Sequence, residues 1–179
     1  MDAKREIWTD EEVAAGIQFL QKVQRNGGWW PTEECMRAAH GAMSVWAPEL
    51  VITESVDLFL NRHKQKILLT LYEGGVRQFS GMWHIPGGYS SITDESMQAA
   101  CARIAKRELG IEARFIRTFG RPYLWRPGEH PYGRPLSLYC LVCPWEKIIE
   151  TDSRKFFYRD NLPDDIVPAH RRFLLEEIF

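Results

Sequence analysis

Residues 87–111, GGYSSITDESMQAACARIAKRELGI, combine a paired glycine, a polar loop and one helix in a single stretch. Gly87 and Gly88 allow the backbone to approach a ligand closely, and the free N–H groups at the start of a helix favour an anion. Helix signals cover roughly residues 94–109, and Gly110 predicts the C-terminal cap. The stretch therefore predicts a site for a phosphate group and a divalent cation bound to it.

Strand and helix signals alternate irregularly around this stretch. Apolar patterns predict strands near residues 50–60, 67–73, 82–86, 111–125, 136–145 and 154–158. The first two read as a hairpin, and residues 111–125 read as one long strand or two broken ones. Pro168 is expected to open a last helix that runs to Phe179. Mixed hairpins and helical crossovers indicate an α/β (α+β) fold, with a mixed sheet and helices on its faces.

Residues 1–48 have a different pattern and are expected to form an N-terminal helical extension, followed by a second domain over residues 49–179. Thr9 and Glu12 form a capping box, and apolar residues then recur at helical spacing until Asn26. A second helix is expected from Thr32 to just before Pro48. The extension is rich in tryptophan, which suggests an interface that would make the protein a homodimer.

Composition excludes several classes of protein. The chain has 179 residues and a formal net charge of -1, which argues against a sequence-independent nucleic-acid binder. No apolar run approaches the roughly 18 residues of a membrane span, and the N-terminus lacks an apolar signal segment, so we expect a cytoplasmic protein without membrane partners. Cys140 and Cys143 lie in an apolar strand without a second metal-binding pair, which predicts reduced thiols.

The segment WHIPGGYSSITDESMQAACARIAKRELGI resembles the signature of the Nudix hydrolases, G-x5-E-x7-R-E-U-x-E-E-x-G-U, in which U is aliphatic. The matching positions are Glu95, Arg103, Glu108, Gly110 and Ile111. The resemblance covers roughly the last 130 residues. It implies an α/β/α sandwich and the hydrolysis, with Mg²⁺ or Mn²⁺, of a nucleoside diphosphate linked to another moiety.

The same resemblance gives a structural role to three residues of the stretch. In the family, a Glu–Arg pair locks the glycine loop to the helix. Gly88, Glu95 and Arg103 are therefore expected to brace the motif rather than to act on a substrate.

The stretch departs from the family signature in three ways. One extra residue lies between Gly88 and Glu95, and Ile104 and Arg107 replace two glutamates. These replacements remove two negative charges and add a positive one. Because a nearby guanidinium repels a cation, they leave room for about one divalent ion.

One branch, the GDP-mannose mannosyl hydrolases, has a similar helix with an aliphatic residue after its arginine. By this resemblance, Glu108 and the Gly87 carbonyl would bind the metal, with Glu150 supplying a carboxylate from a later strand. That branch uses a histidine as its base, but in this chain Thr151 stands near that position. His130 is the substitute that we consider as a base.

Three arginines flank one loop, and together they are expected to bind a diphosphate through bidentate hydrogen bonds: Arg121, Arg126 and Arg134. Taken singly, each is equally consistent with a solvated surface charge. The predicted partner is therefore a small-molecule nucleotide.

Two functions follow from this pattern. The favoured one is a nucleotide-sugar or related Nudix hydrolase dependent on a divalent cation. The alternative is a catalytically inactive Nudix-like module that binds a nucleotide or metabolite as a sensor. This alternative arises because Ile104 and Arg107 replace two of the glutamates in the family signature.

Overall fold

A computed structural model describes residues 9–25, 32, 35, 46–54, 65–73, 77–91, 93–126, 128–130 and 135–178. Most of the second helix expected after Thr32 lies outside these residues, and so does Arg134. In place of the end of that helix, Trp46 and Ala47 begin a strand. Among the described residues no helix is both long and apolar enough to cross a lipid bilayer.

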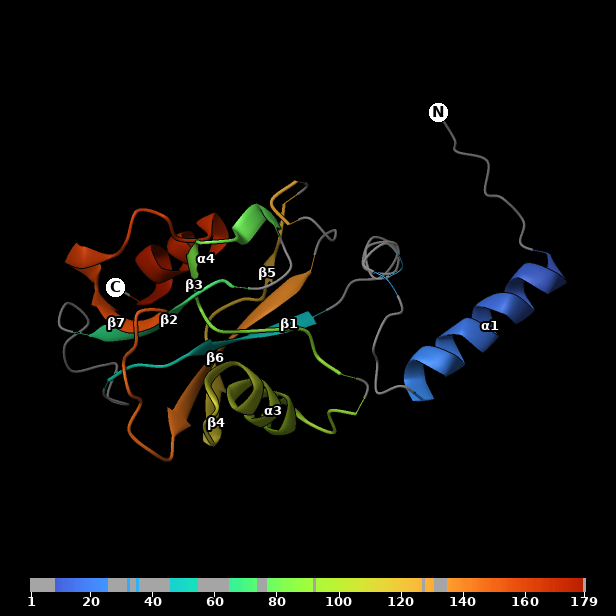
Figure 1. The fold of residues 1–179 in the computed structure, drawn as a ribbon, viewed down its shortest axis with the longest axis horizontal. Coiled ribbons are helices and arrows are strands. Elements are labelled where there is room, and N and C mark those ends of the chain that lie inside the picture. Colours follow the sequence, from blue (N-terminus) through green and yellow to red (C-terminus); the bar gives the residue numbers. More distant parts are fainter. Residues whose placement is uncertain are drawn as a thin grey trace.

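The secondary structure follows the order of the predicted elements closely (Figure 1). Helices and strands run α1 (Asp10–Arg25), β1 (Trp46–Val51), β2 (Lys66–Leu71), η2 (Arg77–Phe79), β3 (Trp83–His84), α3 (Met97–Leu109), β4 (Ala113–Thr118), β5 (Tyr123–Leu124), β6 (Leu136–Pro144), β7 (Arg154–Tyr158), η3 (Arg159–Asn161), α4 (Pro168–Phe173) and the π-helix η4 (Leu174–Ile178). The segment 111–125 forms two strands, β4 and β5, because Gly120 adopts a positive φ of 43° between them.

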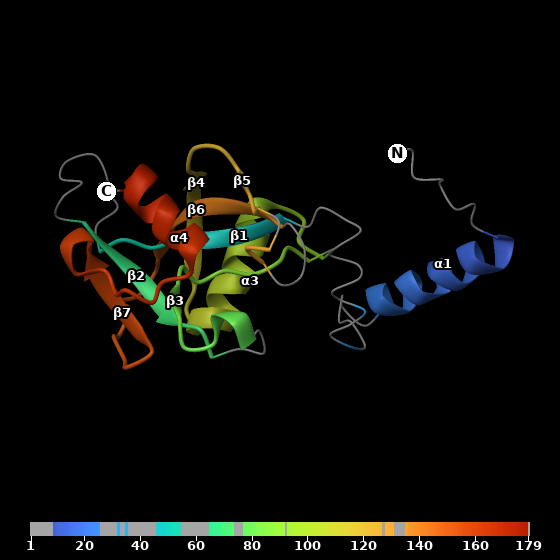
Figure 2. The same cartoon turned by 90° about the horizontal axis from the view of Figure 1, so that it is seen from above.

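The strands form two sheets. In the first, β6 pairs in parallel with β1 and antiparallel with β4 and β5. In the second, β2 lies between β3 and β7, both antiparallel to it; Figure 2 shows these three strands grouped beside β1 and β6. The predicted hairpin of residues 50–60 with 67–73 is confirmed only in its described part, where Ile52 accepts a hydrogen bond from Leu68.

Alternating residues of the central strands bury two apolar layers, one on each face. Leu50, Leu68 and Cys140 share one layer with α3. Val51 and Leu69 share the other with α4 and η4. Figure 1 shows α3 below and α4 above these strands. The predicted α/β (α+β) sandwich with a mixed sheet is therefore confirmed.

Helix α1 has the predicted N-terminal cap. The Thr9 hydroxyl accepts a hydrogen bond from the Glu12 N–H, and the Glu12 carboxylate accepts one from the Thr9 N–H. Val13, Ile17 and Leu20, which carry the helical spacing, are exposed. The prediction for Cys140 and Cys143 is also confirmed, because both are free thiols.

Helix α3 has a cap at each end and one face in the core. The Ser96 side chain accepts a hydrogen bond from the Ala99 N–H, and Gly110 ends the helix with a φ of 71°. Ile104 is fully buried in the layer between α3 and the sheet. The aliphatic residue at this position therefore packs the core and does not face the glycine loop.

The brace between the glycine loop and α3 uses a different acid from the one predicted. Arg103 donates from Nε and Nη2 to the two carboxylate oxygens of Asp94, at 2.8 and 2.7 Å, and also to the Tyr89 carbonyl at 2.9 Å. Glu95 is exposed, because Ser96 caps the helix and directs the preceding residue outward. The extra loop residue thus moves the pair from Glu95 to Asp94.

Replacing Ile104 tests its role in the core. Ile104→Ala should lower the free energy of unfolding by about 2–4 kcal/mol, since it removes buried methyl groups and leaves a cavity. Lys106→Ala on the exposed side of α3 should change it by no more than about 0.5 kcal/mol. Urea unfolding of both variants provides the measurement, and equal stabilities would show that Ile104 contributes nothing to the core.

Replacing Asp94 tests the revised brace. The Arg103 hydrogen bond holds the pKa of Asp94 below its usual 3.8. The folded state is therefore stabilised fully well above pH 3.8, and this contribution is lost as the pH falls through the lowered folded pKa. At pH 7, Asp94→Asn should cost roughly 1–3 kcal/mol.

The matched control for Asp94→Asn is Glu95→Gln, which should be nearly neutral at every pH. Unfolding of the wild type and both variants at pH 7 and at acid pH would measure the difference. If Glu95→Gln lost more stability than Asp94→Asn, Glu95 would be the partner of Arg103, as the sequence predicted.

Candidate functional site

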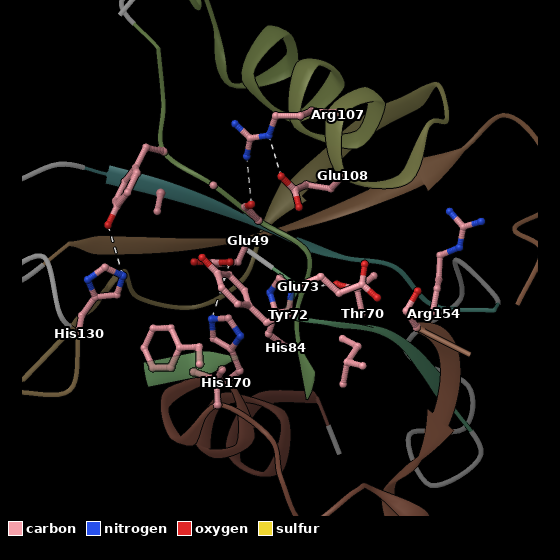
Figure 3. A pocket seen from close by; sticks show the side chains of 18 of the residues that line it. Glu49, Thr70, Tyr72, Glu73, His84, Arg107, Glu108, His130, Arg154 and His170 are labelled. Carbon is pink, nitrogen blue, oxygen red and sulfur yellow. Dashed lines mark hydrogen bonds and ion pairs between the residues drawn. The ribbon is translucent and has the colours of Figure 1, made fainter. Parts of the chain in front are cut away.

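A pocket of about 700 Å³ brings the glycine loop together with residues from both sheets (Figure 3). One part, the aromatic chamber, is formed by Tyr72, Phe79, Tyr89, Trp125 and His130. The other, the arginine end, is formed by Gly87, Gly88, Arg107, Glu108 and Arg154. Glu49, His84 and His170 also line the pocket.

The glycine loop runs against β1. Gly87 forms a β-bridge with Glu49, and the Gly88 N–H donates to the Pro48 carbonyl at 3.2 Å. A Cβ on Gly87 would overlap the Glu49 carboxylate and approach the Pro48 carbonyl. Because Glu49 is buried, that carboxylate has little room to move, so this position requires glycine.

Glu49 is held by a chain of hydrogen bonds that starts directly after β5 and passes through β6. The Trp125 indole N–H donates to the Ser137 hydroxyl at 2.8 Å, and Ser137 donates to Glu49 Oε1 at 2.9 Å. The indole can only donate, which fixes the direction of the chain toward the carboxylate. Glu49 therefore offers a positioned acceptor on the wall of the pocket.

His170 of α4 faces the second oxygen of Glu49. Its Nδ1 accepts a hydrogen bond from the Ile85 N–H at 3.0 Å, so the neutral ring carries its proton on Nε2. Nε2 lies 3.7 Å from Glu49 Oε2 and has no hydrogen-bond partner among the described residues. This buried N–H is therefore directed at the Glu49 carboxylate, its nearest charged neighbour.

Two more buried polar groups surround this pair. Burial lowers the pKa of His84 to about 4, so the His84 ring is neutral near pH 7. His84 Nε2 lies 3.1 Å from the Thr70 hydroxyl. Burial also raises the pKa of Tyr139 well above its usual 10.

At the arginine end, Arg107 bridges the two groups predicted to bind a metal. Its Nε donates to Glu108 Oε1 at 2.6 Å, and its Nη2 donates to the Gly87 carbonyl at 3.3 Å. Figure 3 shows two dashed lines that leave the Arg107 guanidinium, one of them ending on Glu108. Arg154 of β7 donates to the Leu109 carbonyl at 2.7 Å and so caps the C-terminal end of α3.

The predicted metal ligands do not come together as a set. Glu150 is exposed, accepts a hydrogen bond from the Phe156 N–H at 2.6 Å, and is not among the residues that line the pocket. Across the part of the chain that the structure describes, no three His, Cys, Asp or Glu residues are grouped as a metal site. With Arg107 between Glu108 and Gly87, the residues present do not fit a resident Mg²⁺ or Mn²⁺.

The other predicted residues are only partly brought to the pocket. His130 lines the aromatic chamber, with its ring 4.9 Å from that of Trp125 and its Nε2 3.3 Å from the Tyr89 hydroxyl; its role as a base stays a prediction. Arg121 and Arg126 are exposed and do not line the pocket, and Arg134 lies outside the described residues. Arg107 and Arg154 supply the cationic groups instead.

Glu49 and His170 were missed from the sequence, although each leaves a signal. Glu49 is a lone carboxylate inside the apolar run APELVI, and a charge in a buried strand is costly unless it has partners. His170 lies at helical spacing between the buried residues Val167 and Phe173, which places it on the inner face of α4. Neither pattern reveals that the two residues meet.

Several solved structures share this fold. A MutT NUDIX hydrolase from Burkholderia pseudomallei is 19% identical, with a TM-score of 0.53, over 76% of this chain and 99% of that one. A UDP-X diphosphatase is 16% identical, with a TM-score of 0.55, over 96% of this chain and 81% of that one. NrtR from Shewanella oneidensis is 15% identical, with a TM-score of 0.51, over 74% of this chain and 61% of that one. This chain therefore spans less than two thirds of the length of NrtR. Such identities establish the fold alone.

A comparison with curated proteins gives no match. The NUDIX domain, in contrast, matches residues 52–177, which include the glycine loop, α3, β6 and His170. This match covers most of the chain and agrees with the three-layer fold. The chain therefore belongs to the NUDIX domain family.

Proposed function

We propose that this chain is a Nudix hydrolase that adds water across a bond of a nucleoside diphosphate linked to another moiety, such as a sugar. The observation that carries the proposal is the pocket in which the aromatic chamber continues into the arginine end. A nucleoside diphosphate has the same two parts, an aromatic base and an anionic diphosphate. The family resemblance to hydrolases supports the choice of reaction.

The aromatic chamber suits a nucleobase. Phe79, Trp125 and His130 lie with ring centroids 4.9 to 6.0 Å apart, and Tyr89 closes the side formed by the glycine loop. Aromatic faces of this kind stack on bases without a strong preference among them. We therefore assign the nucleobase of the substrate to the aromatic chamber and its phosphates to the arginine end.

Glu49 is our candidate for the general base. Its carboxylate lies against Gly87, where the chamber meets the arginine end, and the Ser137 hydroxyl fixes one of its oxygens. The other oxygen can accept a proton from a water molecule placed in the pocket. His170 Nε2 lies 3.7 Å from this second oxygen and would help to position it.

Mg²⁺ or Mn²⁺ would neutralise charge on the diphosphate when bound. The geometry of Gly87, Glu108 and Glu150 does not support a fixed position for it on these residues. The proposed roles of Glu49, His170 and the aromatic chamber do not depend on that position.

A second candidate function is binding without cleavage. It is favoured by Arg107, which pairs with Glu108 where the family signature has a second acidic residue. A sensor module of this kind would keep the pocket and release its ligand intact. The remaining expectations, a cytoplasmic location and a homodimer formed through residues 1–48, stay predictions.

Turnover of nucleotide sugars, dinucleotides and ADP-ribose, with and without Mg²⁺, tests the proposed hydrolysis. Glu49→Gln should lower kcat by roughly 100-fold or more with little change in KM, because it removes the proton acceptor and keeps the shape. Glu146→Gln, an exposed change of the same type, should leave turnover unchanged.

Thermal melting should first show that Glu49→Gln is folded. Tight binding of a substrate that stays intact after long incubation with wild-type protein would instead identify the binding module. Turnover that is equal in the wild type and Glu49→Gln would remove Glu49 as the base.

A further inference from the structure

Arg107 has a position that its exposure alone does not explain. Its side chain is 50% exposed, yet the guanidinium reaches back across the end of α3 to two acceptors at once. One is the carboxylate of its neighbour Glu108, and the other is the main-chain carbonyl of Gly87. A carboxylate and a carbonyl are the oxygen types that a hard divalent cation binds.

The guanidinium contacts both of these oxygens. It carries one positive charge and neutralises Glu108, so the local charge that would attract Mg²⁺ is cancelled. It also donates hydrogen bonds to both oxygens, which a metal ion would have to displace. The two bonds use Nε and Nη2, so neither uses the two N–H groups of Nη1.

Gly88 keeps this position open. A Cβ on Gly88 would overlap Arg107 Nη2 and lie 3.2 Å from Arg107 Cζ. The backbone of Gly88 does not adopt a positive φ, so an alanine is compatible with its conformation. An alanine at Gly88 would therefore require the Arg107 guanidinium to move away from its present position.

We propose that Arg107 is a built-in cation, which replaces a resident divalent ion between Gly87 and Glu108 and binds the phosphate oxygens of a diphosphate directly. Glu108 then acts as the positioning residue of the guanidinium and not as a metal ligand. The inference relies on the proposed function only for the presence of a diphosphate at the arginine end.

Calorimetric titration with inorganic pyrophosphate in EDTA tests this proposal without turnover. The wild type should bind pyrophosphate without metal, and Arg107→Gln should weaken binding by about tenfold or more, since it removes a charge-assisted bidentate donor. Gly88→Ala should have a similar effect, because it displaces the guanidinium without removing it. The control for Arg107→Gln is Arg114→Gln, which changes an exposed arginine of β4. The control for Gly88→Ala is Gly16→Ala on α1, where a Cβ meets no atom within 4 Å among the described residues. Both controls should bind pyrophosphate as the wild type does.

Electron paramagnetic resonance with Mn²⁺ alone provides the second measurement. Glu108→Gln should leave the Mn²⁺ affinity of the free protein unchanged. A Mn²⁺ site that is lost in Glu108→Gln would overturn the proposal. The proposal would also be overturned if the wild type bound no pyrophosphate, or bound it only with Mn²⁺. Unchanged pyrophosphate binding in Arg107→Gln or in Gly88→Ala would overturn it as well.

These outcomes are separate from those of the proposed hydrolysis. A protein that binds pyrophosphate through Arg107 but cleaves no substrate would retain this inference and lose the enzyme. A protein that cleaves substrates with a Mn²⁺ ion held by Glu108 would retain the enzyme and lose this inference.

Discussion

The pocket depends on the close approach of Glu49 to the main chain of Gly87. This approach places a buried carboxylate on the wall between the aromatic chamber and the arginine end. The Gly87 carbonyl in turn holds Arg107, so one residue without a side chain positions an acid on one side and a cation on the other. Burial of a carboxylate is costly unless hydrogen bonds compensate, and Ser137 supplies that compensation.

Much of the fold could be predicted because its signals are local. The alternation of apolar residues predicted β2, β6 and β7, and the glycine at 110 predicted the end of α3. The error at Glu95 is also local in origin. The helix begins one residue after Ser96, and this start directs Glu95 to solvent and leaves Asp94 facing Arg103.

The site was less predictable, since its residues meet only through long-range pairing. Strand register brings Ser137 to Glu49, and helix packing brings His170 to the same carboxylate. No pattern in the sequence specifies either contact. The role of Arg107 depends on the direction of one flexible side chain, which spacing along α3 does not determine. The arginines near residues 121–126 were predicted from clustering alone, and clustering did not place them in the pocket.

The separation of these partners along the chain also determines when the pocket can form. Glu49 and Ser137 are 88 residues apart, and Ile85 and His170 are 85 apart. Contacts of this length are established late, because the entropy of closing a long loop must be overcome before they form. During synthesis the glycine loop and α3 are made well before β6 and α4. A growing chain therefore contains the glycine loop and α3 before the residues that complete the wall of the pocket, Ser137 and His170, have been made.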